Sequence, residues 1–165
     1  MIQSAAMQHP NIDRVIAALE AGGARPETIA GMRVLPDAVT TAAAAAAALG
    51  VLVEQIANSL VFDADGVPLL VLTSGGHRVD TAKVAGLIGA ERVRRANPEF
   101  VYTATGQRIG GVAPVGHPGR LRTLVDTALA PYSEVWAAGG IPHAVFPTSY
   151  DELLLVTGGT PAEVA

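Results

Sequence analysis

Apolar side chains recur every three or four positions between residues 12 and 19, as they do on one face of an α-helix. Pro10 and Asn11 suit the start of such a helix, and the Gly22-Gly23 pair suits its end. This segment is therefore predicted to be helical. A short extended segment is expected next, over residues 32–35.

An alanine tract occupies residues 42–48. Alanine has the highest helix propensity of all residues, so the tract needs little more than a smooth surface to pack on. The sequence predicts a second helix that begins at Pro36-Asp37, runs through the tract and ends at Gly50.

From Ala57 the pattern changes to short apolar runs that are typical of strands. The runs SLVFD and PLLVLT flank Ala64-Asp65-Gly66, and an Asp-Gly pair between two such runs is a strong signal for a β-hairpin. Further strands are expected at residues 108–113, 121–125, 134–138 and 144–146.

Polar caps and glycines delimit three more predicted helices. These are a helix capped by Asp80 that ends at Gly89, a helix from Asn97-Pro98-Glu99 to Gly106, and a helix capped by Thr148 that runs through Val156. In the first of them, Val84, Leu87 and Ile88 are expected to face the core.

The later strands are joined by Gly/Pro turns that are too short to hold helices, so regular βαβ units are not expected. The predicted fold class is α+β, with a curled, barrel-like mixed β-sheet surrounded by helices. At 165 residues, with no internal repeat or linker, the chain is expected to form one domain over residues 1–165, with a helical N-terminal part at residues 1–50.

Composition excludes several classes of protein. Half of the residues are apolar and 16% are charged, which argues against a disordered chain, a coiled coil or a polybasic nucleic-acid tail. The absence of Cys excludes disulfides, Cys-ligated metals and a thiol nucleophile. The apolar run from Ala42 to Val53 is too short to span a membrane, and the N-terminus lacks the basic start of a signal peptide, so the expected location is the cytoplasm.

The net charge of −4 is unevenly distributed. Residues 1–91 carry about −4 and residues 126–165 about −5, whereas the segment between them carries about +5. Its basic residues are Arg92, Arg94, Arg95, Arg108, Arg120 and Arg122, opposed only by Glu99. Such a segment can bind a polyanion, with Arg108 and Arg120 as candidate substrate contacts, or it can be a solvated face that acidic neighbours neutralise.

Nucleophile and metal motifs are missing. No Ser lies in a G-x-S-x-G motif, and the four His residues show neither H-E-x-x-H nor any other short ligand spacing. A covalent acyl-enzyme, a bound metal and a cofactor are therefore not expected. Among the His residues, His143 beside a glycine turn is the best candidate for a polar group that lines a pocket.

Two glycine pairs and one lysine remain as candidates. Glycine lets main-chain N–H groups approach a ligand closely. If their loops are adjacent, Gly110-Gly111 and Gly139-Gly140 could together bind a carbonyl or phosphate group. Taken by itself, each glycine pair is explained as a turn. Lys83 is the only Lys among 11 basic residues. It belongs either to a site that requires a compact ammonium or to a solvent-exposed helix face.

Residues 58–159 resemble the YbaK and prolyl-tRNA synthetase editing-domain family of aminoacyl-tRNA deacylases. The resemblance is carried by the hairpin NSLVFDADGVPLLVLT, the D-x-x-K helix, the loop GGVAP, the second loop GGIPHAV and the ending LLLVTGG. It implies that the chain hydrolyses the ester between a wrong amino acid and the 3′-terminal adenosine of tRNA. The site residues it implies are Lys83 as the essential lysine, Gly110, Gly111 and Pro114 in the first loop, Gly139 and Gly140 in the second, and Asn58 at the pocket.

The resemblance also implies partners and a mechanism. The expected partners are the aminoacylated 3′ end of tRNA, in particular tRNA-Pro carrying a small amino acid such as Ala or Cys, and prolyl-tRNA synthetase; neither DNA nor a membrane is expected. Glycine N–H groups would form an oxyanion site, Lys83 would hold the terminal phosphate or carbonyl, and the ribose hydroxyl would assist the attacking water. The alternative is a non-catalytic module that binds an adenylate or a tRNA end, or a regulator associated with a synthetase. An esterase for a small metabolite is disfavoured by the missing nucleophile and metal.

Overall fold

A computed structural model describes residues 9–165 of the chain. Residues 1–8, which belong to the segment on which the expectation about a signal peptide rests, lie outside the described residues. No helix among residues 9–165 is both long enough and apolar enough to cross a membrane.

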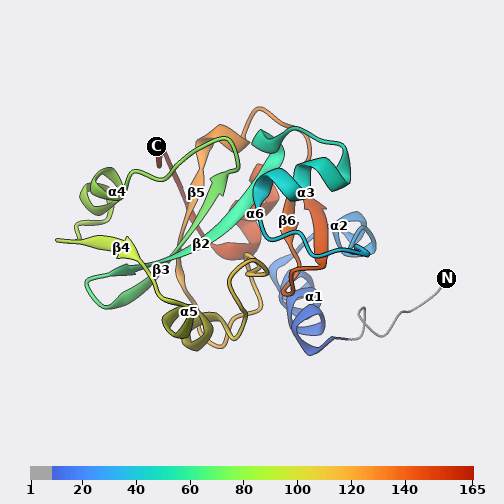
Figure 1. The fold of residues 1–165 in the computed structure, drawn as a ribbon, viewed down its shortest axis with the longest axis horizontal. Coiled ribbons are helices and arrows are strands. Elements are labelled where there is room, and N and C mark those ends of the chain that lie inside the picture. Colours follow the sequence, from blue (N-terminus) through green and yellow to red (C-terminus); the bar gives the residue numbers. More distant parts are fainter. Residues whose placement is uncertain (1–8) are drawn as a thin grey trace.

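An eight-stranded mixed β-sheet forms the centre of the molecule, with helices packed around it (Figure 1). The strands are β1 (Arg33–Val34), β2 (Ile56–Ala64), β3 (Val67–Ser74), β4 (Val93–Arg95), β5 (Arg122–Asp126), β6 (Val135–Ala138), β7 (Ala144–Thr148) and β8 (Thr160–Ala162). Their order is β1-β7-β6-β2-β3-β5-β8, and β4 pairs with β2 beside this path. The predicted α+β class is confirmed, and the sheet is open rather than closed into a barrel.

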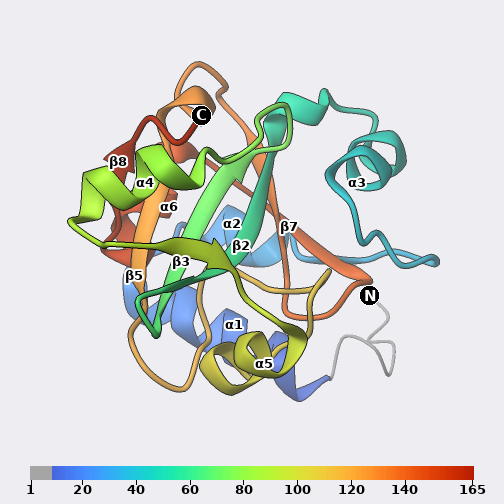
Figure 2. The ribbon, with the colours of Figure 1, turned by 60° about the vertical axis from the view of Figure 1, so that its left-hand side comes forward.

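Helices cover both faces of this sheet. They are α1 (Pro10–Gly22), α2 (Pro26–Ala30), α3 (Ala42–Leu49), α4 (Thr81–Ile88), α5 (Pro98–Thr105) and α6 (Tyr150–Thr157), with short 3₁₀ helices at Val53–Gln55 and Thr127–Leu129. Apolar residues of α1 and α6 pack on one face of β2 and β3, and those of α4 pack on the other. α3 stands apart over its own small cluster around Ile56 and Trp136 (Figure 2).

Local signals in the sequence are realised as predicted in several elements. The chain reverses direction between β2 and β3 at Asp65 and Gly66, both of which have positive φ. The side chain of Asp63 accepts a hydrogen bond from the N–H of Gly66 in this turn (2.6 Å). The side chains of Asp80 and Asn97 accept hydrogen bonds from N–H groups in the first turns of α4 and α5. Each of these hydrogen bonds joins residues three positions apart, which is why the sequence alone predicts them.

Other predictions are wrong. The second helix begins at Ala42 instead of Pro36, because Thr41 caps it by accepting a hydrogen bond from Ala44 N (3.1 Å). Residues 108–113 form turns instead of a strand, and the last helix is capped by Ser149 in place of Thr148. Leu87 does not face the core and is 53% exposed.

Besides the two 3₁₀ helices, the elements α2, β4 and β8, each of at most five residues, were not anticipated from the sequence. β4 and β8 exist because they pair with β2 and β5, partners that are distant along the chain.

Candidate functional site

A cleft of about 270 Å³ lies along one edge of β2. On this side β2 pairs with β6 at Ile56–Ala57 and with β4 at Phe62–Ala64. Between these pairings, residues 58–61 are paired only with β3 on the opposite side. Because an unpaired strand edge presents main-chain N–H and C=O groups, the floor of the cleft offers hydrogen-bonding groups that no neighbouring strand uses.

The walls of the cleft are largely apolar. They come from the loop before α3, from α3 itself, from α5, from the turn at residues 109–112 and from β6. Trp136 belongs to this lining, and its indole N–H donates to a carboxylate oxygen of Glu134 (2.9 Å) while the guanidinium of Arg33 stacks on its ring (4.9 Å). These two contacts hold the indole in one orientation.

Neutral groups dominate the polar lining. The polar side chains are those of Asn58, Ser59, Thr40, Thr41 and Arg95; within the described part of the chain, no Asp, Glu, His or Lys lines the cleft. The hydroxyl oxygen of Ser59 is buried and has no hydrogen-bond partner among residues 9–165. A buried hydroxyl without a partner costs free energy, so this oxygen is suited to a hydrogen bond with a ligand or a water.

Of the residues singled out in the sequence, Asn58 and Gly110 meet at this cleft. Gly110 has a φ of +93°, and a Cβ there would lie 3.2 Å from Thr40. Glycine is therefore required both by the backbone conformation and by the close approach of the loop before α3.

The two glycine loops pack directly against each other, but not as a cradle of free N–H groups. A Cβ on Gly111 would lie 2.6 Å from the carbonyl carbon of Ile141, so the two backbones are in contact. The N–H of Gly111 donates to Arg108 O (2.9 Å) and that of Gly139 to Ala144 O (2.8 Å). These two N–H groups are already used, in contrast to the expectation that they stabilise an oxyanion.

Gly140 lies away from the cleft. It is buried against α1, and its carbonyl accepts a hydrogen bond from the side chain of Asn11 (3.1 Å). His143 is half-buried and is not part of the cleft lining.

The turn that contains His143 supports the cleft from behind. The carbonyl of His143 accepts from Leu35 N (2.7 Å), and that of Pro142 accepts from Val39 N (2.8 Å). The same turn contacts Gly111, which precedes Val112 in the opposite wall. The second glycine loop therefore holds two walls of the cleft together.

Lys83 lies elsewhere. It is exposed on α4, which is on the far side of the molecule from α3 in Figure 2, and its ammonium donates to the main-chain oxygen of Ala165 (2.9 Å). It is not among the residues that line the cleft. The helix face that carries Lys83 points to the C-terminal segment, so Lys83 does not share the cleft with Gly110, and its role as the essential lysine stays a prediction.

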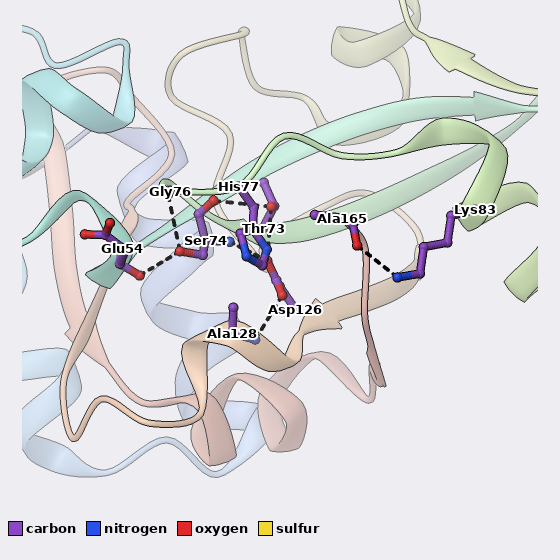
Figure 3. A network of polar contacts seen from close by, with 9 residues as sticks. All are labelled: Glu54, Thr73, Ser74, Gly76, His77, Lys83, Asp126, Ala128 and Ala165. Atoms are coloured by element: carbon purple, nitrogen blue, oxygen red, sulfur yellow. Dashed lines mark hydrogen bonds and ion pairs between the residues drawn. The ribbon is translucent and has the colours of Figure 1, made fainter.

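A buried carboxylate organises a separate polar network (Figure 3). Asp126 is fully buried and accepts hydrogen bonds from Thr73 Oγ1 (3.2 Å), Ser74 N (3.0 Å) and Ala128 N (2.9 Å). Nδ1 of His77 lies 2.9 Å from the same carboxylate, and its ring is partly exposed. Lys83 and Ala165 lie to one side of this network.

Pro114 and Arg120 line a second cavity, also of about 270 Å³. His117 lies in this cavity and donates from Nε2 to Ala113 O (2.8 Å). Burial lowers the pKa of His117, although the hydrogen bond to Ala113 acts in the opposite direction. The two predicted substrate contacts are thus separate from the cleft on β2, as is Arg108, whose guanidinium stacks on Tyr102 (4.6 Å).

Sequence reasoning missed Thr40, Thr41, Ser59 and Trp136 as members of the site. Thr41 carried a usable signal, because Thr before an alanine tract is a favoured helix cap and places the preceding residues in a loop. Ser59 carried none, since its hydroxyl is unpartnered only in the folded molecule.

Comparisons with known proteins agree with this architecture. Residues 36–155 match the family model described as aminoacyl-tRNA editing domain. The proline--tRNA ligase of Nitratidesulfovibrio vulgaris (strain DP4) is 34% identical over 105 residues, which are 64% of this chain and 18% of that protein. The corresponding ligase of Bacillus licheniformis is 37% identical over 91 residues, 55% of this chain and 16% of that protein.

A solved structure matches nearly the whole chain. It is described provisionally as a trans-editing enzyme for prolyl tRNA synthetase, has a TM-score of 0.84 and 41% identity, and the match covers 94% of this chain and 97% of that one. By contrast, the chain spans less than a fifth of the length of the ligases named above. The family match covers well over half of the described residues, and the chain therefore belongs to the aminoacyl-tRNA editing domain family.

Proposed function

We propose that this protein hydrolyses the ester bond of mischarged aminoacyl-tRNA, acting in trans on tRNA-Pro that carries a small amino acid. The observation that carries the proposal is the cleft on the open edge of β2, whose lining, as far as residues 9–165 form it, is apolar apart from neutral hydrogen-bonding groups and one arginine. Membership in the editing-domain family supports the reaction, and the similarity to prolyl-tRNA ligases and to a structure described as their trans-editing enzyme supports the tRNA.

The chemistry of the lining fits an ester that is already activated. Water attacks the ester carbonyl carbon, the bond between this carbon and the ribose oxygen breaks, and the products are a free amino acid and a tRNA with a free hydroxyl. No general acid or base among residues 9–165 lines the cleft, so the neighbouring ribose hydroxyl of the substrate relays the proton from the water to the leaving oxygen.

Asn58 is proposed to stabilise the oxyanion. Its carboxamide provides N–H donors at the floor of the cleft, and a fixed Asn donor is one of the known means of stabilising a developing oxyanion. The unpartnered hydroxyl of Ser59 belongs to the next residue of the strand and lies on the opposite face from Asn58, so it is proposed to orient the attacking water from the other side of the open edge. Gly110 completes this set of groups by allowing its wall to approach closely.

The pocket also selects for size. Ala42 and Ala45 leave space on the α3 side, and Val39 and Val145 bound the cleft with branched side chains. A methylene contributes only about 1 to 3 kcal/mol to discrimination in a synthetase, so a second site that hydrolyses whatever small residue enters it adds accuracy. The proposed amino acids are therefore Ala and Cys.

The test is a deacylation assay with tRNA-Pro charged with labelled Ala, Cys or Pro. The wild-type chain is expected to release Ala or Cys faster than Pro, and Asn58→Ala is expected to lower kcat about 100- to 1000-fold. Asn97→Ser, which keeps a helix cap outside the cleft, serves as the matched control and should retain normal kcat. Release from none of the three substrates by the wild-type chain would instead support a non-catalytic binding module.

A further inference from the structure

The six arginines of the basic segment do not form a single patch. Arg94 pairs with Asp63 (3.4 Å), and Arg122 donates to Ile88 O (3.4 Å). Arg108 stacks on Tyr102, and Arg120 lines the second cavity. Four of the six are therefore engaged away from the cleft.

Arg95 differs from the others because it lines the cleft on β2. Within residues 9–165 it forms none of the ion pairs, and its side chain is exposed. Its neighbour Arg94 neutralises Asp63, the acidic residue of the adjoining strand. Arg95 is thus a free guanidinium at the edge of a cleft that contains no other charged side chain among the described residues.

Strand register places Arg95 on the same face as Asn58. Arg95 lies opposite Phe62 in the antiparallel pairing of β4 with β2, and opposite residues share a face of the sheet. Because side chains alternate along a strand, Phe62 and Asn58 also share that face. Phe62 and Asn58 are four residues apart, about 13 Å along the strand. Arg95 and Asn58 line the same cleft.

We infer that Arg95 binds the 5′-phosphate of the nucleotide whose aminoacyl ester lies at Asn58. The inference rests on the proposed function. The apolar lining and neutral polar groups accept an uncharged nucleoside and a small side chain, and the single cation matches a single anion at one end of that ligand. A guanidinium binds phosphate oxygens through two parallel hydrogen bonds, so it positions the nucleotide as well as attracting it.

The experiment compares two minimal substrates, 3′-O-alanyl-AMP and 3′-O-alanyl-adenosine, which differ only in the 5′-phosphate. The wild-type chain is expected to prefer the phosphorylated substrate in kcat/KM. Arg95→Ala should raise KM for 3′-O-alanyl-AMP about 10- to 100-fold, leave kcat nearly unchanged, and not alter the kinetics of 3′-O-alanyl-adenosine. Arg94→Ala is the matched control, because it removes the neighbouring guanidinium from β4, and it should keep the preference for phosphate.

Two results would overturn the inference: an equal loss on both substrates, or no loss on either. Calorimetric binding of AMP and adenosine keeps the test independent of catalysis. AMP should bind the wild-type chain more tightly than adenosine does, with the difference decreasing as salt increases, and Arg95→Ala should abolish that difference. If the wild-type chain binds AMP in this way but hydrolyses neither substrate, the proposed deacylation fails while the phosphate contact stands.

Discussion

Two polar regions lie side by side on the sheet, and they differ in whether the protein itself supplies hydrogen-bond partners for their buried polar groups. Asn58 on β2 is opposite Thr73 on β3, and the hydroxyl of Thr73 donates to the carboxylate of Asp126 on β5. The carboxylate of Asp126 accepts hydrogen bonds from several groups of the protein itself, whereas in the residue after Asn58 the hydroxyl of Ser59 is buried and unpartnered among the described residues.

This difference in hydrogen bonding indicates a structural role for the region around Asp126 and a functional role for the region around Asn58. A buried carboxylate with several donors is stable without a ligand, so its role is to hold β3, β5 and the segment around His77 together. A buried hydroxyl on an open strand edge lowers its free energy only when something binds. Substitutions in the two regions are therefore expected to have opposite effects on stability and on catalysis.

Asp126→Ala is expected to give the largest effect on folding. Removing the carboxylate leaves the N–H groups of Ser74 and Ala128 without an acceptor, which should lower the free energy of unfolding by about 3 kcal/mol. Urea denaturation measures this change. The kcat of the folded fraction should remain near normal, and a selective loss of kcat at unchanged stability would contradict the structural role of Asp126.

Ser59→Ala is expected to show the opposite behaviour. It removes a hydroxyl that has no partner among residues 9–165, so the free energy of unfolding should stay the same or rise. Deacylation should slow about 10-fold, the effect of losing one hydrogen bond of about 1.4 kcal/mol to the attacking water. Parallel denaturation and single-turnover measurements test both parts. A marked loss of stability would show that the hydroxyl has an internal role instead.

Glu152→Gln tests a second buried carboxylate whose oxygens accept hydrogen bonds from the protein itself. Burial acts to raise the pKa of Glu152. Its carboxylate also accepts hydrogen bonds from Arg25 N, Thr28 and Thr148 and lies near the positive charge of Arg25. Together these interactions outweigh burial and lower the pKa. A carboxyl whose pKa is lower in the folded state stabilises the protein above its unfolded pKa, and this stabilisation is lost as pH falls through the folded value.

The expected loss in Glu152→Gln is about 1 kcal/mol at pH of about 7. The difference in free energy of unfolding between wild type and variant should shrink as pH falls below the ordinary carboxyl pKa of about 4.5. Denaturation across this range measures it. A difference that is constant with pH would exclude the proton linkage.

Lys83→Ala is expected to have the smallest effect. Among residues 9–165 the exposed ammonium donates a single hydrogen bond, to the main-chain oxygen of Ala165, so deacylation should stay within about twofold of wild type and stability should change little. The assignment of Lys83 as the essential lysine predicts a complete loss of activity instead. The tRNA deacylation assay with Lys83→Ala and Lys83→Arg decides between these outcomes.

Local chemistry explains which parts of the fold were predictable. The Asp65-Gly66 hairpin and the caps of α4 and α5 depend on hydrogen bonds between residues three positions apart, which a sequence displays directly. β4 and β8 have only three residues each and depend on pairing with β2 and β5. Their own residues carry too little information to reveal them.

The site was predictable only in part. Asn58 and Gly110 were singled out in advance and line the cleft, but Lys83 does not, and Arg95 was indistinguishable from five other arginines in the basic segment. Lys83 was singled out because it is the only lysine in the sequence. Composition, however, carries no information about the direction in which a side chain points.

The sequence by itself determined the family, the mixed α+β class and the local turns and caps, because these follow from motifs and from short-range hydrogen bonds. Only the tertiary structure decided where the cleft lies. Its floor exists because β6 and β4, distant from β2 and from each other along the chain, pair with the two ends of β2 and leave residues 58–61 open between them. The same long-range pairing separates Arg95 from Arg94 and leaves Lys83 on the outer helix, since strand register and packing, not residue type, set the position of each charge.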